Sequence, residues 1–227
     1  ILAAGQGTRM RPLTNDRPKA LIEVGGKALI DHVIDPLVAA GVEQIVVNVH
    51  AFADQMEAHL RRRNDVKILI SDERAKLLET GGGIKHARAM LGDDPIFVCN
   101  SDYVWLKPGE PALETMAKAW DPARMDALLV VIPKERTLGF DTPGDFFQAP
   151  DGTLTHRGDA AEAPLHCFGI EIIDPTLLYA DPRDAFTQRD IWIAATQKKR
   201  PYGLQLDGLW MQVGDPEALE VAEARLK

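Results

Sequence analysis

The chain has 227 residues, 45% of them hydrophobic and 26% charged, which excludes disordered and fibrous classes and favours one larger-than-average domain over 1–227. Its net charge of −8 argues against nucleic acid or an anionic membrane as a partner. No apolar run approaches the ~20 residues of a membrane-spanning helix, and two cysteines are too few for a disulfide framework, so we expect a cytoplasmic protein with reduced thiols.

The first half of the chain alternates strand-type and helix-type patterns. Its opening residues, Ile1-Leu2-Ala3-Ala4, look like the end of a strand, and because no Met precedes them we expect a few further native residues before Ile1. Apolar residues at helical spacing predict helices at 28–40, 52–63 and about 82–91. Short apolar runs predict buried strands at 45–49, 66–70 and 96–99. This alternation predicts a parallel sheet with helices on both faces.

The second half changes character. A turn-rich stretch with the hairpin signal Asp151-Gly152 separates the elements that we predict there, which are a helix at 113–120 and strands at 127–132 and 165–173. A closing helix, Pro216–Leu226, follows Asp215, which is placed to cap it. We therefore expect a mixed sheet, part parallel and part antiparallel, with the 145–165 region forming a lid or wall over the strand ends.

Ligands of open α/β sheets bind outside the carboxyl ends of the strands, where the strand order switches direction. The segments that follow the predicted strands are therefore the candidates for function. They are 3–19, 48–52, 71–82, 100–105 and 207–215.

The first of these segments carries Gly5 and Gly7, whose flexible backbone exposes N–H groups that bind phosphate oxygens. Met10 stands where the dinucleotide fingerprint needs a third glycine, which disfavours an oxidoreductase, and no P-loop sequence follows. Residues 1–20 have a charge of +3, so the remaining residues carry −11. The charged residues of this segment are Arg9, Arg11, Arg17 and Lys19 against Asp16. A bound polyphosphate is predicted; a solvated basic loop and an ordinary glycine turn are the alternatives.

The stretch Leu2-Ala-Ala-Gly-x-Gly-Thr-Arg-Met-x-Pro-Leu-Thr14, followed by Pro18-Lys19, resembles the signature of sugar-1-phosphate nucleotidyltransferases, and the resemblance extends to Trp210-Met-Gln-Val-Gly214. It implies a Rossmann-like three-layer α/β sandwich with a mixed, mainly parallel central sheet and an antiparallel sugar-side portion. The nucleotide-binding half would be 1–105 and the sugar-phosphate-binding half 106–227. Lys19 would neutralise the α-phosphate. The residues implied to hold the nucleoside triphosphate are Ala3, Ala4, Gly5, Gly7, Thr8 and Arg9.

Asp102 follows the predicted strand at 96–99, and a carboxylate beside a polyphosphate loop suits Mg²⁺, a hard cation that prefers oxygen ligands. The resemblance supports Asp102 as the catalytic metal ligand; a turn cap is the alternative. Family members usually carry a second metal aspartate where this chain has Gln212, whose neutral amide is a weaker ligand. Asp215 is then either a water-mediated ligand or, in the interpretation we favour, only a helix cap.

Glu79-Thr80-Gly81 precedes two further glycines at the start of the predicted helix, where a flat base or ribose can approach the backbone closely. In this family the corresponding loop binds the nucleobase, so these three residues are base-reading candidates; a flexible helix start is the alternative. The Glu-Thr-Gly-Gly-Gly form is similar to that of uridylyltransferases acting on N-acetylmuramate-1-phosphate, which implies those two substrates and a role in recycling the cell wall.

The sugar side is the least defined part of the predicted site. Gly139, Phe140 and Gly169 occupy places that contact the sugar phosphate in relatives, but the Glu-Lys pair that many relatives use is absent. The implied reaction is in-line attack of the sugar phosphate on the α-phosphorus of the triphosphate, which needs positioning and charge neutralisation by Arg9, Lys19 and Mg²⁺. A mannose- or heptose-1-phosphate guanylyltransferase and a non-catalytic nucleotide-sugar sensor are the alternatives. We expect a monomer or a homodimer.

Overall fold

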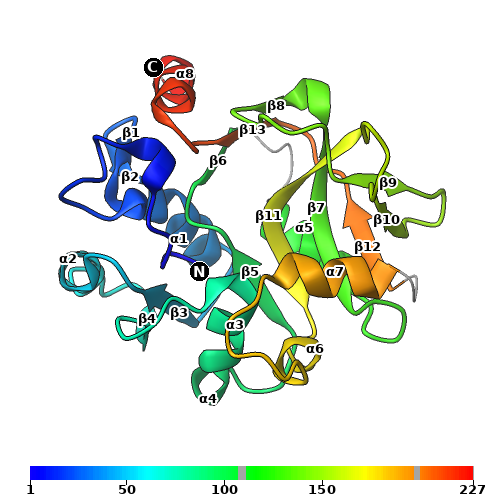
Figure 1. Ribbon diagram of the computed structural model, residues 1–227, viewed down its shortest axis with the longest axis horizontal. Coiled ribbons are helices and arrows are strands. Elements are labelled where there is room, and N and C mark those ends of the chain that lie inside the picture. The colour runs from blue at the N-terminus through cyan, green and yellow to red at the C-terminus, as the bar shows by residue number, and fades with distance from the viewer. Residues whose placement is uncertain (107–110, 197–199, 227) are drawn as a thin grey trace.

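The computed structural model of the chain describes residues 1–106, 111–196 and 200–226, and its central sheet lies between layers of helices (Figure 1). The strands of that sheet are β3 (Gln44–Val49), β4 (Lys67–Asp72), β5 (Ile96–Cys99), β7 (Ala127–Pro133), β11 (Leu165–Ile173) and β12 (Pro201–Leu204). No helix within the described ranges is long and apolar enough to cross a membrane.

One strand of the central sheet, β11, runs opposite to the others. It pairs antiparallel with both β5 and β7, whereas β12 pairs parallel with β7 and β3 pairs parallel with β4. The opening residues join these two groups, since Leu2 forms a parallel bridge with Asn100 and the Asn48 N–H donates to the Ile1 carbonyl. The predicted mixed, mainly parallel sheet is therefore confirmed. Within it β5, from residues 1–105, pairs with β11, from residues 106–227.

Each face of this sheet is covered by helices. Along β7, Leu128, Val130 and Ile132 belong to one buried cluster, and the alternating residues Ala127, Leu129 and Val131 belong to another. The first cluster includes side chains of α1 (Leu29–Ala39), α2 (Ala53–Leu60) and α5 (Ala112–Ala119), and the second includes side chains of α3 (Glu79–His86), α6 (Thr176–Tyr179) and α7 (Gln188–Thr196). Because successive side chains of a strand point to opposite faces, one strand contributes to both layers of a three-layer sandwich.

A second, smaller sheet continues from the end of β5. In it β13 (Leu209–Gln212) pairs antiparallel with β6 (Tyr103–Leu106) and parallel with β8 (Thr137–Leu138). A third apolar cluster joins this sheet to α8 (Pro216–Leu226) and to the hairpin of β1 (Glu23–Val24) and β2 (Lys27–Ala28). The hairpin of β9 (Phe146–Gln148) and β10 (Leu154–His156), which turns at the predicted Asp151-Gly152, extends the central sheet from β11. The remaining short helices are η1 (Thr8–Met10), η2 (Lys19–Leu21), α4 (Arg88–Leu91) and η3 (Lys134–Arg136).

The helix predicted at about 82–91 differs from the observed structure. It is two helices, α3 and α4, and α3 begins earlier, at Glu79, because the Phe186 carbonyl accepts the N–H groups of Gly81 and Gly82. The sequence patterns did not predict α7, along which Trp192 is buried but its neighbours Arg189 and Asp190 are exposed, so no long apolar stripe marks it. The short strands of the small sheet, β6, β8 and β13, were also not predicted.

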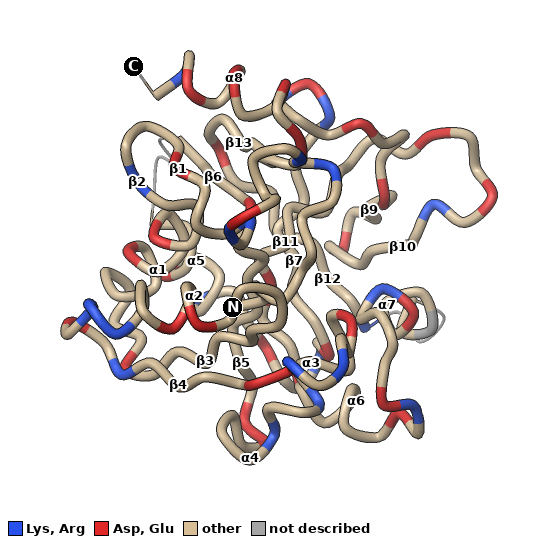
Figure 2. The backbone as a smooth tube through the Cα atoms, turned by 60° about the vertical axis from the view of Figure 1, so that its left-hand side comes forward, with Lys and Arg blue, Asp and Glu red and all other residues tan. Residues whose placement is uncertain are grey.

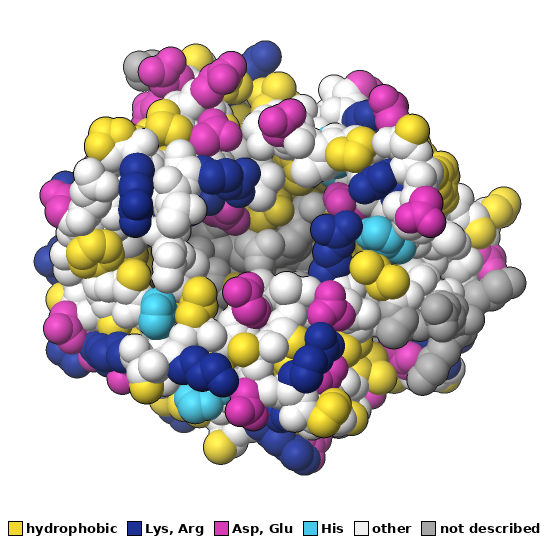
Figure 3. All heavy atoms as spheres, in the orientation of Figure 1, with side chains coloured by type: hydrophobic (Ala, Val, Ile, Leu, Met, Phe, Trp, Pro, Cys, Tyr) yellow, Lys and Arg dark blue, Asp and Glu magenta, His cyan; other side chains and the backbone are white. Residues whose placement is uncertain are grey.

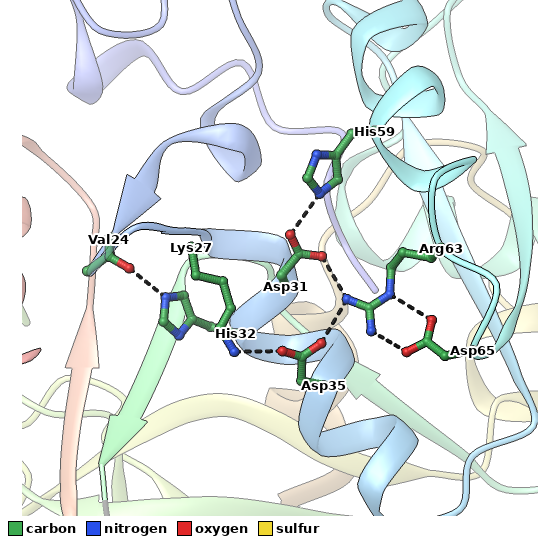
Figure 4. Close-up of polar contacts among 8 residues, drawn as sticks. All are labelled: Val24, Lys27, Asp31, His32, Asp35, His59, Arg63 and Asp65. Atoms are coloured by element: carbon green, nitrogen blue, oxygen red, sulfur yellow. Dashed lines mark hydrogen bonds and ion pairs between the residues drawn. The ribbon is translucent and has the colours of Figure 1, made fainter.

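An ion-pair network ties the end of α2 to α1 (Figure 4). The Arg63 guanidinium lies 2.9 Å from Asp31 and 2.8 Å from Asp35, both on α1, and 2.6 Å from Asp65. Nε2 of His59 lies 2.8 Å from Asp31. These charges satisfy one another, so we assign this network to the packing of the two helices.

Candidate active site

A cavity of about 310 Å³ opens where the opening residues and the carboxyl ends of β3, β4 and β5 meet. Figure 3 shows a hollow at the centre of this side of the molecule, with acidic and basic side chains around it. All five segments that follow the predicted strands contribute to the cavity. Its lining residues are Leu2, Ala3, Ala4, Gly5, Gly7, Thr8, Arg9, Lys19, Ala20, Asn48, Leu77, Glu79, Thr80, Asn100, Ser101, Asp102, Gln212 and Gly214.

The backbone that follows the first strand is fixed from behind by Asn48. The Asn48 Oδ1 accepts the N–H groups of Ala3 at 2.6 Å and Ala4 at 3.2 Å, and its Nδ2 donates to the buried Glu73 carboxylate at 2.8 Å. Gly5 lies beyond these anchored residues and is exposed, and a Cβ added to it would meet no described atom within 4 Å. The structure thus combines a fixed backbone with open space at Gly5.

Lys19 and Asp102 form an ion pair at 2.6 Å, with side chains only 15% and 18% exposed. Gly7 allows Lys19 to lie there, because Gly7 has a left-handed φ of 62° and a Cβ on it would be 2.9 Å from the Lys19 Cβ. The Arg9 guanidinium lies over Gly214, 3.3–3.5 Å from where a Cβ would be. Two cations and one carboxylate therefore meet in the cavity, although they come from distant parts of the sequence.

The basic charge of residues 1–20 is less concentrated at the cavity than the sequence predicts. Of its four cations only Arg9 and Lys19 line the cavity, and Arg17 pairs with Asp16 at 3.0 Å. Over the rest of the chain, basic and acidic residues are interspersed (Figure 2). The cavity thus has a local cationic character that is balanced in part by Asp102.

The small sheet brings Gln212 next to Asp102. Gln212 is opposite Tyr103 in the β13–β6 ladder, and the Val213 N–H donates to the Asp102 carbonyl at 2.9 Å. Asp215 does not line the cavity, and its Oδ1 accepts the Ala218 N–H at 2.9 Å, which makes it the helix cap that we favoured. Within the described ranges no group of three or more His, Cys, Asp or Glu residues is arranged to hold a metal. Asp102 and Gln212 nevertheless both line the cavity, and each side chain carries an oxygen of the kind that Mg²⁺ accepts as a ligand.

Two of the three base-reading candidates line the cavity. Glu79 is exposed there with a left-handed φ of 61°, and the Thr80 Oγ1 accepts the Gln188 N–H at 2.9 Å. Gly81 is not part of the lining, and its N–H donates to the Phe186 carbonyl at 2.9 Å. The structure therefore places Glu79 and Thr80, but not Gly81, where a base could contact them.

The structure also corrects the reason for the three glycines at the start of α3. A Cβ on Gly81 would overlap the Phe186 ring, and one on Gly82 would overlap the Asp184 carbonyl. A Cβ on Gly83 would lie 2.6 Å from the Glu73 carboxylate. The glycines thus allow close packing of α3 against the protein itself rather than leaving room for a ligand.

A second cavity of about 230 Å³ adjoins the first and shares Asn100 and Gln212 with it. Of the three predicted sugar-side residues, Phe140 and Gly169 line this cavity and Gly139 does not. Gly169 has a φ of 68°, and a Cβ on it would overlap the Asn100 side chain, so the glycine leaves space for Asn100 at the boundary between the cavities. Gly139 packs directly against the Gln212 carbonyl and acts only as a support for β13.

Sequence reasoning did not identify Asn48, Glu73 or Asn100, which shape the first cavity. Asn48 is a polar residue within the buried run of β3, and this was a usable signal because buried polar side chains require partners. No sequence pattern marked Glu73 in this way. Its Oε2 accepts the Leu78 N–H at 3.2 Å, and this contact depends on the shape of the turn between the two residues.

The sequence profile of the MobA-like NTP transferase domain matches residues 1–201. The chain belongs to the MobA-like NTP transferase family. It is 51% identical to the N-acetylmuramate alpha-1-phosphate uridylyltransferase of Caulobacter vibrioides, over 100% of this chain and 95% of that protein. It is 31% identical to a mannose-1-phosphate guanyltransferase of Aspergillus oryzae, over 96% of this chain but 60% of that protein.

Solved structures show the same fold for this MobA-like NTP transferase. A putative glucose-1-phosphate thymidylyltransferase from Bacillus anthracis superimposes with a TM-score of 0.80 at 17% identity, over 100% of this chain and 93% of that one. The resemblance to sugar-1-phosphate nucleotidyltransferases and the Rossmann-like fold that it implied are both confirmed.

Proposed function

We propose that this protein is a uridylyltransferase that joins UTP and N-acetylmuramate-1-phosphate to form the nucleotide-diphospho-sugar and pyrophosphate. One observation carries the proposal: Arg9, Lys19 and Asp102 meet in a cavity beside the open Gly5, in a chain 51% identical over its full length to a relative named for this activity. A role in recycling cell-wall sugars follows from that substrate.

The chain's own residues supply binding and charge neutralisation. The triphosphate lies along the loop at 3–9, where Gly5 leaves space and Arg9 faces the cavity. Lys19 stabilises the charge that builds up on the α-phosphate as the sugar phosphate attacks in line and pyrophosphate leaves. The attacking phosphate is already an anion, so no strong base is needed, and holding the two substrates in line accounts for much of the acceleration.

Asp102 is the residue that would hold Mg²⁺, with the Gln212 amide oxygen beside it. The donor set fits this ion, because Mg²⁺ in nucleotide sites is commonly bound by one or two carboxylates together with phosphate oxygens and water. When bound, the ion would neutralise charge on the phosphates. The Lys19 ammonium pairs with the Asp102 carboxylate at 2.6 Å, so it lies beside the position where the ion would be held and can neutralise a phosphate bound there.

Replacing Asp102 tests the metal assignment. Asp102→Asn keeps the shape of the side chain and removes its charge. We expect turnover to fall by roughly 100-fold or more, and the Mg²⁺ concentration that gives half-maximal rate to rise. Asp35→Asn is the matched control, because Asp35 pairs with Lys27 at the same distance of 2.6 Å outside the cavity. An unchanged Mg²⁺ titration for Asp102→Asn would rule out this role.

Pyrophosphate release by the wild-type protein tests the substrates. UTP, GTP and dTTP are each combined with the 1-phosphates of N-acetylmuramate, N-acetylglucosamine and mannose, with Mg²⁺ or with EDTA. We expect the fastest release from UTP with N-acetylmuramate-1-phosphate and none with EDTA. Fastest release from GTP with mannose-1-phosphate would favour the guanylyltransferase, whose candidacy rests on the 31% identity to such a relative. Nucleotide binding without pyrophosphate release would indicate a sensor.

A further inference from the structure

The second cavity contains two nitrogen donors that face each other without an acceptor. His156, at the end of β10, and Arg189, at the start of α7, both line it, and Nη2 of Arg189 lies 3.4 Å from Nε2 of His156. This is the sole polar contact of the Arg189 side chain with the described part of the chain. Arg189 is exposed toward this cavity and forms no ion pair with a described residue.

The state of the His156 ring determines what this contact is. The Gly158 N–H donates to Nδ1 of His156 at 3.0 Å, so Nδ1 must be the accepting nitrogen. Burial, followed by the charge of Arg189, lowers the pKa of His156 against the opposing charge of Asp145. The ring is therefore neutral at pH 7 and carries its one proton on Nε2. The His156 Nε2–H and the Arg189 N–H groups are then both donors. They point at the same place, so the contact between them is not a hydrogen bond.

No acidic residue in the described ranges pairs with Arg189 or accepts a hydrogen bond from His156. Asp145 lines the same cavity, but its Oδ2 accepts the Cys167 N–H at 2.9 Å, and it is not within ion-pair distance of Arg189. Arg157, the other nearby cation, donates to the backbone carbonyls of Gly144 and Ala160. The Arg189–His156 pair therefore has the geometry of an anion site that is completed by a ligand.

We infer that Arg189 and His156 bind a carboxylate carried by the sugar substrate, and that this contact selects N-acetylmuramate-1-phosphate over sugars that lack the acid. The inference rests on the proposed function, because the second cavity adjoins the nucleotide cavity through Asn100 and Gln212 and is where the sugar would lie. N-acetylmuramate differs from N-acetylglucosamine by one lactyl ether, which adds a single carboxylate. Arg189 is thus a specificity residue rather than a contributor to the transfer step.

Arg189→Met tests this assignment against two sugar phosphates. Loss of a charge-assisted pair raises KM for N-acetylmuramate-1-phosphate by roughly 10- to 100-fold, with kcat changed little. The inhibition constant of N-acetylglucosamine-1-phosphate, which lacks the acid, stays at the wild-type value. Arg189→Lys, which restores a cation, recovers part of the lost affinity. Arg61→Met, at a side chain that is 74% exposed and pairs only with Glu57 within the described residues, is the matched control and changes neither constant.

The outcomes separate this inference from the proposed function. If wild-type protein transfers UMP to N-acetylmuramate-1-phosphate and Arg189→Met weakens both sugars equally, or neither, the carboxylate site is wrong while the function stands. If wild-type protein transfers UMP to neither sugar, the proposed function is wrong, and calorimetry with free N-acetylmuramate and N-acetylglucosamine decides the site alone. If wild-type protein binds free N-acetylmuramate and Arg189→Met does not, the site is supported. If the two sugars bind equally well, the site is wrong.

Discussion

Gly5 is the residue whose surroundings say most about the ligand. It has no left-handed φ, and a Cβ there would meet no described atom within 4 Å, so nothing in the described part of the protein requires a glycine at this position. Gly5→Ala should therefore leave the free energy of unfolding unchanged or raise it by about 0.4–1 kcal/mol, because alanine restricts the unfolded chain.

The same substitution should weaken nucleotide binding. A methyl group placed where the triphosphate lies overpacks the site, and we expect the Kd for UTP to rise by roughly tenfold or more. Urea unfolding and calorimetry measure the two effects separately. If affinity remains at the wild-type level, the phosphates do not lie against Gly5.

Glu171 is a buried carboxyl group on β11, and its Oε1 accepts a hydrogen bond from Gln188, which lines the second cavity. Burial raises its pKa from 4.5 to about 8, and the side chains of Gln188 and Trp192 oppose this shift by hydrogen bonding. Between these pH values the folded chain retains a proton that the unfolded chain releases. Stability should therefore fall as pH rises from 4.5 to 8, by up to about 1.4 kcal/mol per pH unit from this group.

Glu171→Gln replaces the titratable carboxyl group with an amide of nearly the same size. The free energy of unfolding of the variant, relative to wild type, should increase steadily from pH 5 to pH 8. Urea titrations at several pH values across this range, on both proteins, provide the test. A difference that stays constant with pH would mean that Glu171 is ionised in the folded protein.

At the scale of elements, α3 packs closely against residues 184–186, which precede α7. Gly82→Ala would force its Cβ into the Asp184 carbonyl, so we expect a loss of about 1–3 kcal/mol in the free energy of unfolding. Gly5→Ala is the natural comparison, because it makes the same chemical change in open space. Equal stability of the two variants would contradict the close packing that we describe.

The sequence predicted the elements whose signal is local. β11 and α8 were located from their apolar pattern and their cap, and the loop at 3–9 from its glycines and Arg9. By contrast, α7 was missed because its register depends on partners far away, such as the bond from the Gln188 N–H to Thr80, 108 positions earlier in the chain. The roles of Gly81 and Gly139 were assigned from sequence position. The structure shows that the Phe186 ring already fills the space beside Gly81, and that the Gln212 carbonyl fills the space beside Gly139.

At the scale of the whole molecule, the two cavities lie on either side of Asn100 and Gln212. The first contains Arg9, Lys19 and Asp102, and the second contains the Arg189–His156 pair. The central sheet and the small sheet meet between these cavities, since Asn100 follows β5 and Gln212 ends β13. This arrangement fits a reaction between two anionic substrates. Each would bind in its own cavity, and their reacting phosphates would meet at the boundary between the cavities.

The central claim is that the first cavity is where nucleotidyl transfer takes place, and the turnover of Lys19→Ala tests it most directly. Lys27→Ala is the matched control, because Lys27 pairs with Asp35 at 2.6 Å as Lys19 does with Asp102, but outside the cavity (Figure 4). With UTP, N-acetylmuramate-1-phosphate and Mg²⁺, we predict that Lys19→Ala lowers kcat for pyrophosphate release by roughly 100-fold or more while Lys27→Ala stays near the wild-type rate. Wild-type turnover in a folded Lys19→Ala protein would contradict the account.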